Sequence, residues 1–253
     1  MRKAVILVGS VLFGLIASLV HGQITESPET VAPGRFLLEM DALSLTIDRN
    51  AGAKYTGVGA ATTFLTTGLT ANWDIQLGAE LFLSQKYEQG SFTERHSGIG
   101  DVYVRTKWRM FSDTETGTAL AVMPYIKIPT NSGGVGNHSM EGGLIVPWAV
   151  ILPVEFSFAA MVQLDFLRND KDDGYDTALY GSMALSRQVT KTIGLYAELT
   201  AGKSSGGAAW AGGLGGGVTF AVSDKISWDF AVYRGISRGA ADWNPVLRLN
   251  WGF

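Results

Sequence analysis

The stretch VEFSFAAMVQLDFL at residues 154–167 decides the fold class. Apolar side chains occupy every second position, from Val154 through Val162 to Phe166, and the positions between them carry mostly polar or small side chains. Successive side chains of a β-strand point to opposite faces, so this stretch predicts a strand with one apolar and one polar face.

The same period of two recurs along the chain, most clearly at residues 73–83 and 99–110. It predicts twelve strands, near residues 35–46, 54–66, 73–84, 99–110, 118–129, 139–149, 154–167, 176–187, 192–201, 210–222, 226–234 and 243–253. An even strand number is typical of a bacterial single-chain outer-membrane barrel. Mostly short turns alternate with longer outer loops, which are predicted near residues 85–98, 130–138, 168–175, 202–209 and 235–242.

Composition excludes several classes of protein. The chain is 46% hydrophobic and only 17% charged, which excludes a disordered chain, and it has no cysteine for a disulfide scaffold. A formal net charge of −3 excludes a strongly basic binder, so we expect no nucleic-acid partner. After residue 22, no apolar stretch reaches the ~20 residues of a membrane helix. This leaves a secreted β-protein with a large core or a membrane β-barrel.

The N-terminus has the layout of a secretory signal. Arg2 and Lys3 precede an apolar run over residues 4–20, and small residues follow it. We therefore predict a signal peptide over residues 1–22, cleaved after Gly22, and an outer-membrane barrel over residues 23–253. The alternative is a transmembrane anchor, because a run of about 17 apolar residues could just span a bilayer.

Tryptophan and the C-terminus supply two further signals for a barrel in lipid. All seven tryptophans lie on the apolar face near predicted strand ends, where indole rings form girdles at the membrane interfaces, and they are Trp73, Trp108, Trp148, Trp210, Trp228, Trp243 and Trp251. Leu247, Leu249 and Trp251 then alternate up to a terminal Phe253. This ending resembles the signal that the barrel assembly machinery reads in outer-membrane proteins. The predicted partners are that machinery, outer-membrane lipid and a small-molecule solute.

Charged side chains fall on the polar face of the predicted strands, which would line the lumen. The residues chosen as lumen lining are Glu80, Asp101, Arg105, Lys107, Arg109, Lys127, Glu141, Glu155, Asp165 and Arg248. Ionised groups are costly against lipid but can be paired or hydrated in a wet lumen. One interpretation is a charged lining that orders permeating solutes. The other is a salt-bridge network that fills and stiffens the barrel.

The size of the lumen limits what could pass. Twelve strands would give a backbone diameter of roughly 24 Å, from which inward side chains take several Å at each wall. The inward-facing glycines Gly213, Gly215 and Gly217 would leave local room. Any channel would therefore suit small solutes.

Enzymatic chemistry finds little support in the sequence. His96 and His138 are the histidines outside the predicted signal, and each is followed by a serine. Adjacent residues of a strand point to opposite faces, so neither pair is a ready nucleophile and base. We expect no catalytic residues, no metal site and no cofactor. An outer-membrane lipid hydrolase stays as an alternative that uses these histidines.

Two short motifs carry a family resemblance. The segment Gly98-Ile99-Gly100-Asp101 with the basic strand after it, and Lys127-Ile128-Pro129-Thr130 at the end of the next strand, resemble the outer-membrane barrel family named for a MetA pathway of phenol degradation. The resemblance implies a transporter or channel, with uptake of aromatic compounds. Gly100, Asp101, Lys127, Pro129 and Thr130 are carried over as markers of hairpin architecture.

These observations predict a twelve-stranded, antiparallel, up-and-down barrel in the outer membrane. Its predicted function is passive passage of small solutes, with hydrophobic or aromatic ones as candidates. A structural barrel with a plugged lumen is the alternative that the charge pattern leaves open.

Overall fold

The computed structural model describes residues 24–50, 52–169, 173–207 and 209–253, so the predicted signal peptide lies outside the described residues. Within these ranges the chain forms thirteen strands, β1 (Phe36–Asn50), β2 (Ala53–Thr70), β3 (Trp73–Gln89), β4 (Phe92–Gly98), β5 (Val102–Asp113), β6 (Thr118–Ile128), β7 (Glu141–Leu152), β8 (Phe156–Arg168), β9 (Tyr175–Gln188), β10 (Ile193–Ser204), β11 (Ala211–Ala221), β12 (Ile226–Gly235) and β13 (Trp243–Gly252). A 3-10 turn, η1 (Pro153–Glu155), joins β7 to β8.

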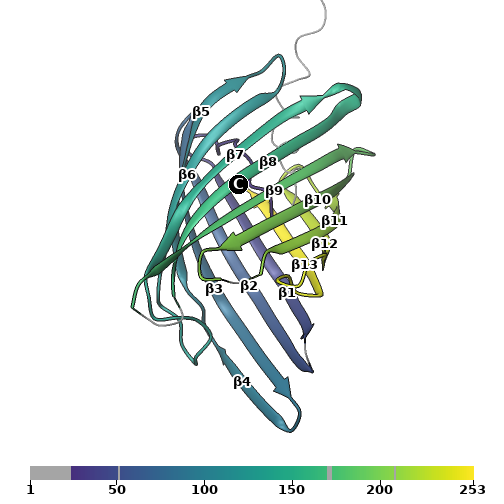
Figure 1. Ribbon diagram of the computed structural model, residues 1–253. Coiled ribbons are helices and arrows are strands. Elements are labelled where there is room, and N and C mark those ends of the chain that lie inside the picture. The colour runs from purple at the N-terminus through teal and green to yellow at the C-terminus, as the bar shows by residue number, and fades with distance from the viewer. Residues whose placement is uncertain (1–23, 51, 170–172, 208) are drawn as a thin grey trace, which may run out of the picture.

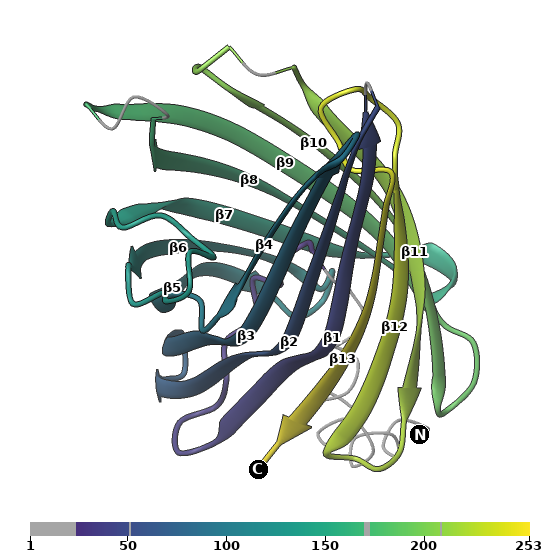
Figure 2. The same ribbon diagram turned by 90° about the horizontal axis from the view of Figure 1, so that it is seen from below.

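The strands close into one antiparallel barrel (Figures 1 and 2). Consecutive strands pair along the chain, except that β5 pairs with β3 instead of β4, and β1 pairs with β13 to complete the ring. Phe36 and Phe253 seal this closure, because each donates its backbone N–H to the other's carbonyl at 2.8 and 2.9 Å, and their rings stack 5.5 Å apart. Closure gives each strand of the ring a neighbour on both sides, which is the condition for crossing lipid with strands, and of the described strands only the short β4 has a free edge.

β4 and β5 share one position in the ring. β3 pairs with β5 over its first half and with β4 over its second half, so the barrel wall has the predicted twelve strands. The prediction of a loop at residues 85–98 is wrong. These residues form a hairpin of β3 and β4 that turns at Gly90, where φ is +59°. β4 carries polar residues on both faces, so the sequence does not show the alternation of apolar and polar residues that predicts a strand.

Bulges explain why the alternating pattern is weak in β1 and β2. The pairing of β1 with β13 shifts register between Asp41 and Leu43, and Ala61 on the neighbouring strand has φ +55°. Asp41 faces the lumen, whereas Leu43, two residues later, is exposed on the outer surface. An extra residue moves all the following side chains to the other face of the strand.

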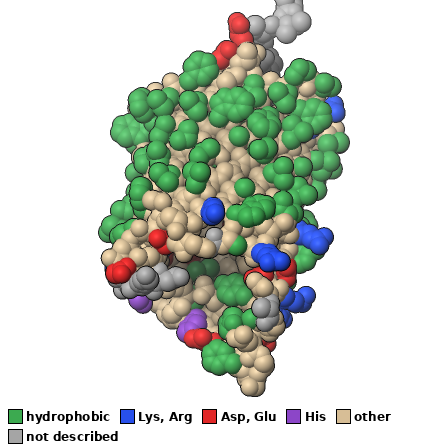
Figure 3. Space-filling view, viewed as in Figure 1, with side chains coloured by type: hydrophobic (Ala, Val, Ile, Leu, Met, Phe, Trp, Pro, Cys, Tyr) green, Lys and Arg blue, Asp and Glu red, His purple; other side chains and the backbone are tan. Residues whose placement is uncertain are grey.

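The outer surface of the barrel is apolar. Figure 3 shows hydrophobic side chains spread over the body of the barrel and charged side chains toward the end that carries β4. Six of the seven tryptophans are exposed on this surface, and Trp228 is half-buried. No helix among the described residues is long and apolar enough to cross a membrane.

Candidate functional site

The N-terminal segment, residues 24–33, lies inside the barrel. Thr25 donates its backbone N–H and its hydroxyl to Glu198 of β10, both at 2.5 Å, and its hydroxyl lies 2.8 Å from that of Ser182 on β9. Ile24 packs against two buried clusters on different parts of the wall, one around Met161 and one around Tyr233. Glu198, Ser182 and Met161 lie near the middle of their strands, so the tip of the segment sits deep in the lumen (Figure 2).

The segment enters at the end of the barrel where β1 begins. Pro33 bridges to Gly68, and Thr30 donates to the carbonyl of Ala71 at 2.9 Å, beside the turn between β2 and β3. Gly68 is required for this approach, because a Cβ there would lie 2.1 Å from the carbonyl oxygen of Val31. With the predicted orientation, this end faces the periplasm.

Three of the predicted lining residues, Arg105, Lys107 and Arg109, follow one another at every second position of β5 and contact this segment. We call them the basic ladder. Arg105 donates from Nη1 to Glu26 Oε1 at 3.0 Å, and Arg109 forms an ion pair with Glu29. Lys107, between them, donates to the backbone carbonyl of Glu29 at 3.3 Å. The ion-pair partners of Arg105 and Arg109 therefore come from residues before the first strand, whereas Lys107 stands opposite Asp74 of β3 in the wall.

Aromatic rings surround the guanidinium of Arg105. The centroids of Phe64, Tyr103 and Tyr125 lie 4.1, 5.7 and 5.8 Å from its Cζ. Phe64 reaches this position by lying across Gly78, where a Cβ would be 2.3 Å from the ring. Such an arrangement favours a cation over ring faces.

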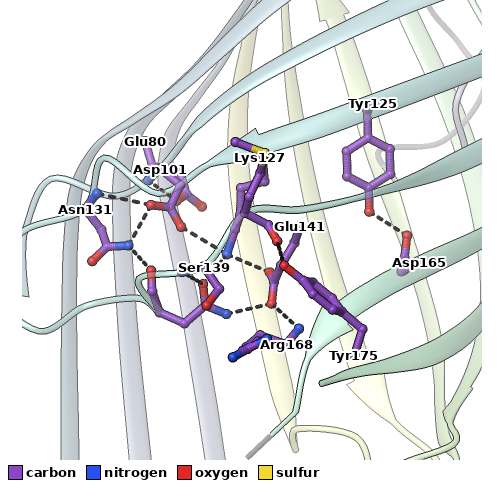
Figure 4. Close-up of polar contacts among 12 residues, drawn as sticks. Glu80, Asp101, Tyr125, Lys127, Asn131, Ser139, Glu141, Asp165, Arg168 and Tyr175 are labelled. Carbon is purple, nitrogen blue, oxygen red and sulfur yellow. Dashed lines mark hydrogen bonds and ion pairs between the residues drawn. The ribbon is translucent and has the colours of Figure 1, made fainter. Parts of the chain in front are cut away.

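A second cluster lies at the other end of the barrel (Figure 4). Lys127 bridges Asp101 at 3.2 Å and Glu141 at 2.6 Å, and Asp101 also accepts from the side chain of Asn131 at 2.7 Å. The backbone N–H of Asp101 donates to Glu80 at 2.9 Å. Four of the predicted lining residues therefore form one buried network, which holds the loop after β6 against the wall.

The two other predicted lining residues of the wall each have a local partner. Arg248 of β13 donates from Nε to Asp41 of β1 at 2.6 Å, directly across the closure of the barrel. Asp165 of β8 accepts from the hydroxyl of Tyr125 at 2.5 Å (Figure 4).

The glycines of β11 seat tyrosine rings. A Cβ at Gly215 would lie 2.1 Å from the ring of Tyr233, and one at Gly217 would lie 2.4 Å from the hydroxyl of Tyr196. Tyr233 donates its hydroxyl to Glu198, the same carboxylate that holds the tip of the N-terminal segment. The expectation that Gly213, Gly215 and Gly217 leave open room is therefore corrected, because tyrosines from β10 and β12 fill the space at the last two and a Cβ at Gly213 would lie 2.8 Å from the Thr200 hydroxyl.

Glu155 does not line the lumen. It belongs to the turn η1, where Val154 and Glu155 both have positive φ, and its side chain is exposed. The alternation that begins at Val154 in the sequence becomes a strand only at Phe156. The prediction for Glu155 is wrong because the first two residues of the alternating stretch, Val154 and Glu155, belong to the turn and not to the strand.

The histidines lie at the outer end of the barrel. His96 of β4 contacts Glu94 at 2.8 Å, and His138 lies in the loop before β7. Within the described residues, no three His, Asp or Glu side chains are grouped so that they could hold a metal ion.

Sequence reasoning missed the residues that enter the lumen from outside the strand pattern. Glu26 and Glu29 lie in a segment that contains proline and has no alternation of apolar and polar residues. The alternation rule therefore cannot predict which way their side chains point. Phe64 lies beyond the bulge in β2, where parity has changed. The spacing of two glutamates before the first strand, opposite a ladder of three cations, is the one signal in the sequence.

Residues 22–251 match the model of the family described as "Putative MetA-pathway of phenol degradation". The chain belongs to this family. The resemblance seen in the motifs around Asp101 and Lys127 is thereby confirmed. No curated protein matches the sequence significantly.

Solved structures share the fold of this family member at low sequence identity. The porin NanC has a TM-score of 0.54 and 9% identity, covering 85% of this chain and 98% of the other. The β domain of the Bordetella autotransporter BrkA has a TM-score of 0.56 and 14% identity, covering 88% and 100%. The translocator domain of NalP from Neisseria meningitidis has a TM-score of 0.55 and 12% identity, covering 87% of each chain. The fold is thus that of outer-membrane barrels.

Proposed function

We propose that the protein is an outer-membrane channel for the passive passage of small solutes, with aromatic ones as the favoured class. The observation that carries this proposal is the closed barrel with Arg105 among Phe64, Tyr103 and Tyr125 on its inner wall. Ligand sites combine apolar and aromatic walls with a few placed polar groups, and this lining has that composition. The description of the family, with its reference to phenol degradation, agrees with an aromatic solute.

The proposal includes a route to the membrane. The signal peptide over residues 1–22 would direct export, and the assembly machinery would read the C-terminal strand ending in Phe253. The apolar outer surface supports placement in outer-membrane lipid. Fractionation followed by heat-modifiable gel migration tests this, and a protein recovered soluble in the periplasm would contradict it.

Planar-bilayer recording tests the channel itself. The channel proposal predicts stepwise current after insertion of the purified protein, at least when the N-terminal segment has been released from the lumen. A plugged structural barrel is the second candidate, favoured by the segment's position on Glu198 and Arg105. It predicts a silent bilayer under every condition.

Two substitutions distinguish a lipid hydrolase from a channel. His96→Ala and His138→Ala would abolish hydrolysis of phospholipid by such an enzyme. A channel keeps the same conductance, because His96 pairs with Glu94 on the outer hairpin and His138 is exposed in the loop before β7. Loss of a measurable lipase activity in the double variant would refute the channel as the main function.

A further inference from the structure

We propose that the N-terminal segment is a plug whose glutamates occupy a binding site for aromatic carboxylates, and that such a solute opens the lumen by displacing them. The inference rests on the proposed function, because it names the solute class and the control of the same lumen.

The plug is attached in a way that permits release. Its one β-bridge to the wall, among the described residues, is at Pro33 and Gly68, which fixes its base. Beyond this base the contacts are mainly between side chains or from the backbone to side chains, at Glu26, Glu29 and Thr25. The closed ladder of the barrel runs from β1 to β13 and contains none of these residues, so release of the plug leaves the wall intact.

The plug satisfies only part of the hydrogen-bonding capacity of the Arg105 guanidinium. Glu26 accepts from Nη1 alone, and the buried Nε has no hydrogen-bond partner among the described residues. A guanidinium binds a carboxylate best through two parallel hydrogen bonds. A free carboxylate, which is not tethered to the plug's backbone, can take both Nε and Nη and so compete with Glu26.

The surroundings of Arg105 select an aromatic acid. Phe64, Tyr103 and Tyr125 place three rings within 6 Å of the guanidinium carbon, so the ring of a bound acid finds aromatic partners beside its carboxylate. Aromatic pairs with centroids 4.5–7 Å apart attract each other beyond simple burial. A neutral aromatic alcohol has the ring but lacks the charge that displaces Glu26.

The rest of the ladder continues the site along β5. Lys107 and Arg109 follow Arg105 at every second position, which is about 7 Å per step in a strand. Arg109 is paired with Glu29, so the second plug carboxylate marks a second anion position nearer the plug's base. An acid that takes the place of Glu26 thus finds further cations on the side where the plug enters.

Planar-bilayer recording with benzoate and benzyl alcohol tests the proposal on the full-length mature chain. Wild-type protein is expected to be mostly closed, and benzoate is expected to raise its open probability while benzyl alcohol does not. The variant E26Q/E29Q keeps the shape of both side chains and removes their charges. We expect it to open about tenfold more often without any ligand, because charge-assisted hydrogen bonds are the stronger kind. E94Q, which removes a carboxylate on the outer hairpin, should behave as wild type.

Two results would overturn the inference. One is an equal response of wild type to benzoate and benzyl alcohol. The other is an E26Q/E29Q variant whose open probability without ligand is as low as that of E94Q. The variant E26K/E29K separates this failure from failure of the channel, because it repels the ladder and expels the plug. Current through E26K/E29K with no benzoate effect on wild type refutes only the carboxylate site. Silence of E26K/E29K, in correctly folded protein, refutes the channel as well.

Discussion

Replacing Gly215 by alanine tests whether the glycines of β11 exist to seat tyrosine rings. The new Cβ would lie 2.1, 2.6 and 2.7 Å from three ring carbons of Tyr233, whereas carbon atoms in contact are about 3.5–4.0 Å apart. The ring must therefore move by more than 1 Å, and such overpacking costs about 1–3 kcal/mol. The movement also strains the hydrogen bond to Glu198, and a bond to a charged group contributes about 1.5–3 kcal/mol.

We expect Gly215→Ala to lower the free energy of unfolding by about 3 kcal/mol, which is over a hundredfold in the unfolding equilibrium. Urea unfolding in detergent micelles, followed by tryptophan fluorescence, measures it. The matched control is Gly181→Ala on β9, where a Cβ meets only the carbonyl oxygen of Met161 at an ordinary 3.5 Å. Gly181→Ala should be neutral or slightly stabilising, because alanine loses less backbone entropy than glycine.

A double-mutant cycle shows whether the clash is the cause. In a Tyr233→Ala background the ring is gone, so Gly215→Ala should cost little more than the Gly181→Ala control. Equal destabilisation by Gly215→Ala with and without the tyrosine ring would refute the reasoning. So would a Gly215→Ala protein that is as stable as the control.

Two further predictions concern the ends of the barrel. Lys127→Met removes the shared cation of the buried carboxylates Asp101 and Glu141, and leaving such charges unpaired should lower the unfolding free energy by about 3 kcal/mol in the same urea assay. An unchanged midpoint would show that the network carries no net stability. Phe253→Ala loses the stacked ring of Phe36, worth about 1 kcal/mol, and with it the C-terminal aromatic residue. The fraction of heat-modifiable protein in the outer membrane should fall, and an unchanged fraction would contradict a role in assembly.

The barrel wall was largely predictable because lipid imposes one rule on every strand. Charged side chains such as Asp101, Arg105 and Lys127 cannot face hydrocarbon, so parity alone places them on the inner face. The rule fails where the backbone breaks the period of two. Bulges at Asp41 and Ala61 reverse the faces of β1 and β2, and no residue type in the sequence marks them.

The contents of the lumen were not predictable by the same rule. Lipid constrains the outer face of a strand and says nothing about a segment that never touches it. The alternation of faces therefore could not place Glu26 and Glu29, although they form ion pairs with Arg105 and Arg109. The prediction of open space beside the glycines of β11 failed for a related reason. A small residue predicts space, but the tyrosine that fills the space comes from the neighbouring strand, and only the register shows this.

The most direct measurement is a disulfide between Thr25→Cys and Ser182→Cys. The two hydroxyl oxygens lie 2.8 Å apart, within reach of a bridge of about 2.05 Å, and the natural chain has no cysteine to compete. If the N-terminal segment plugs the lumen, the folded protein should form this bond on oxidation and stay closed in the presence of benzoate until a reductant is added. Two thiols that stay free and reactive in the folded, oxidised protein would contradict the account.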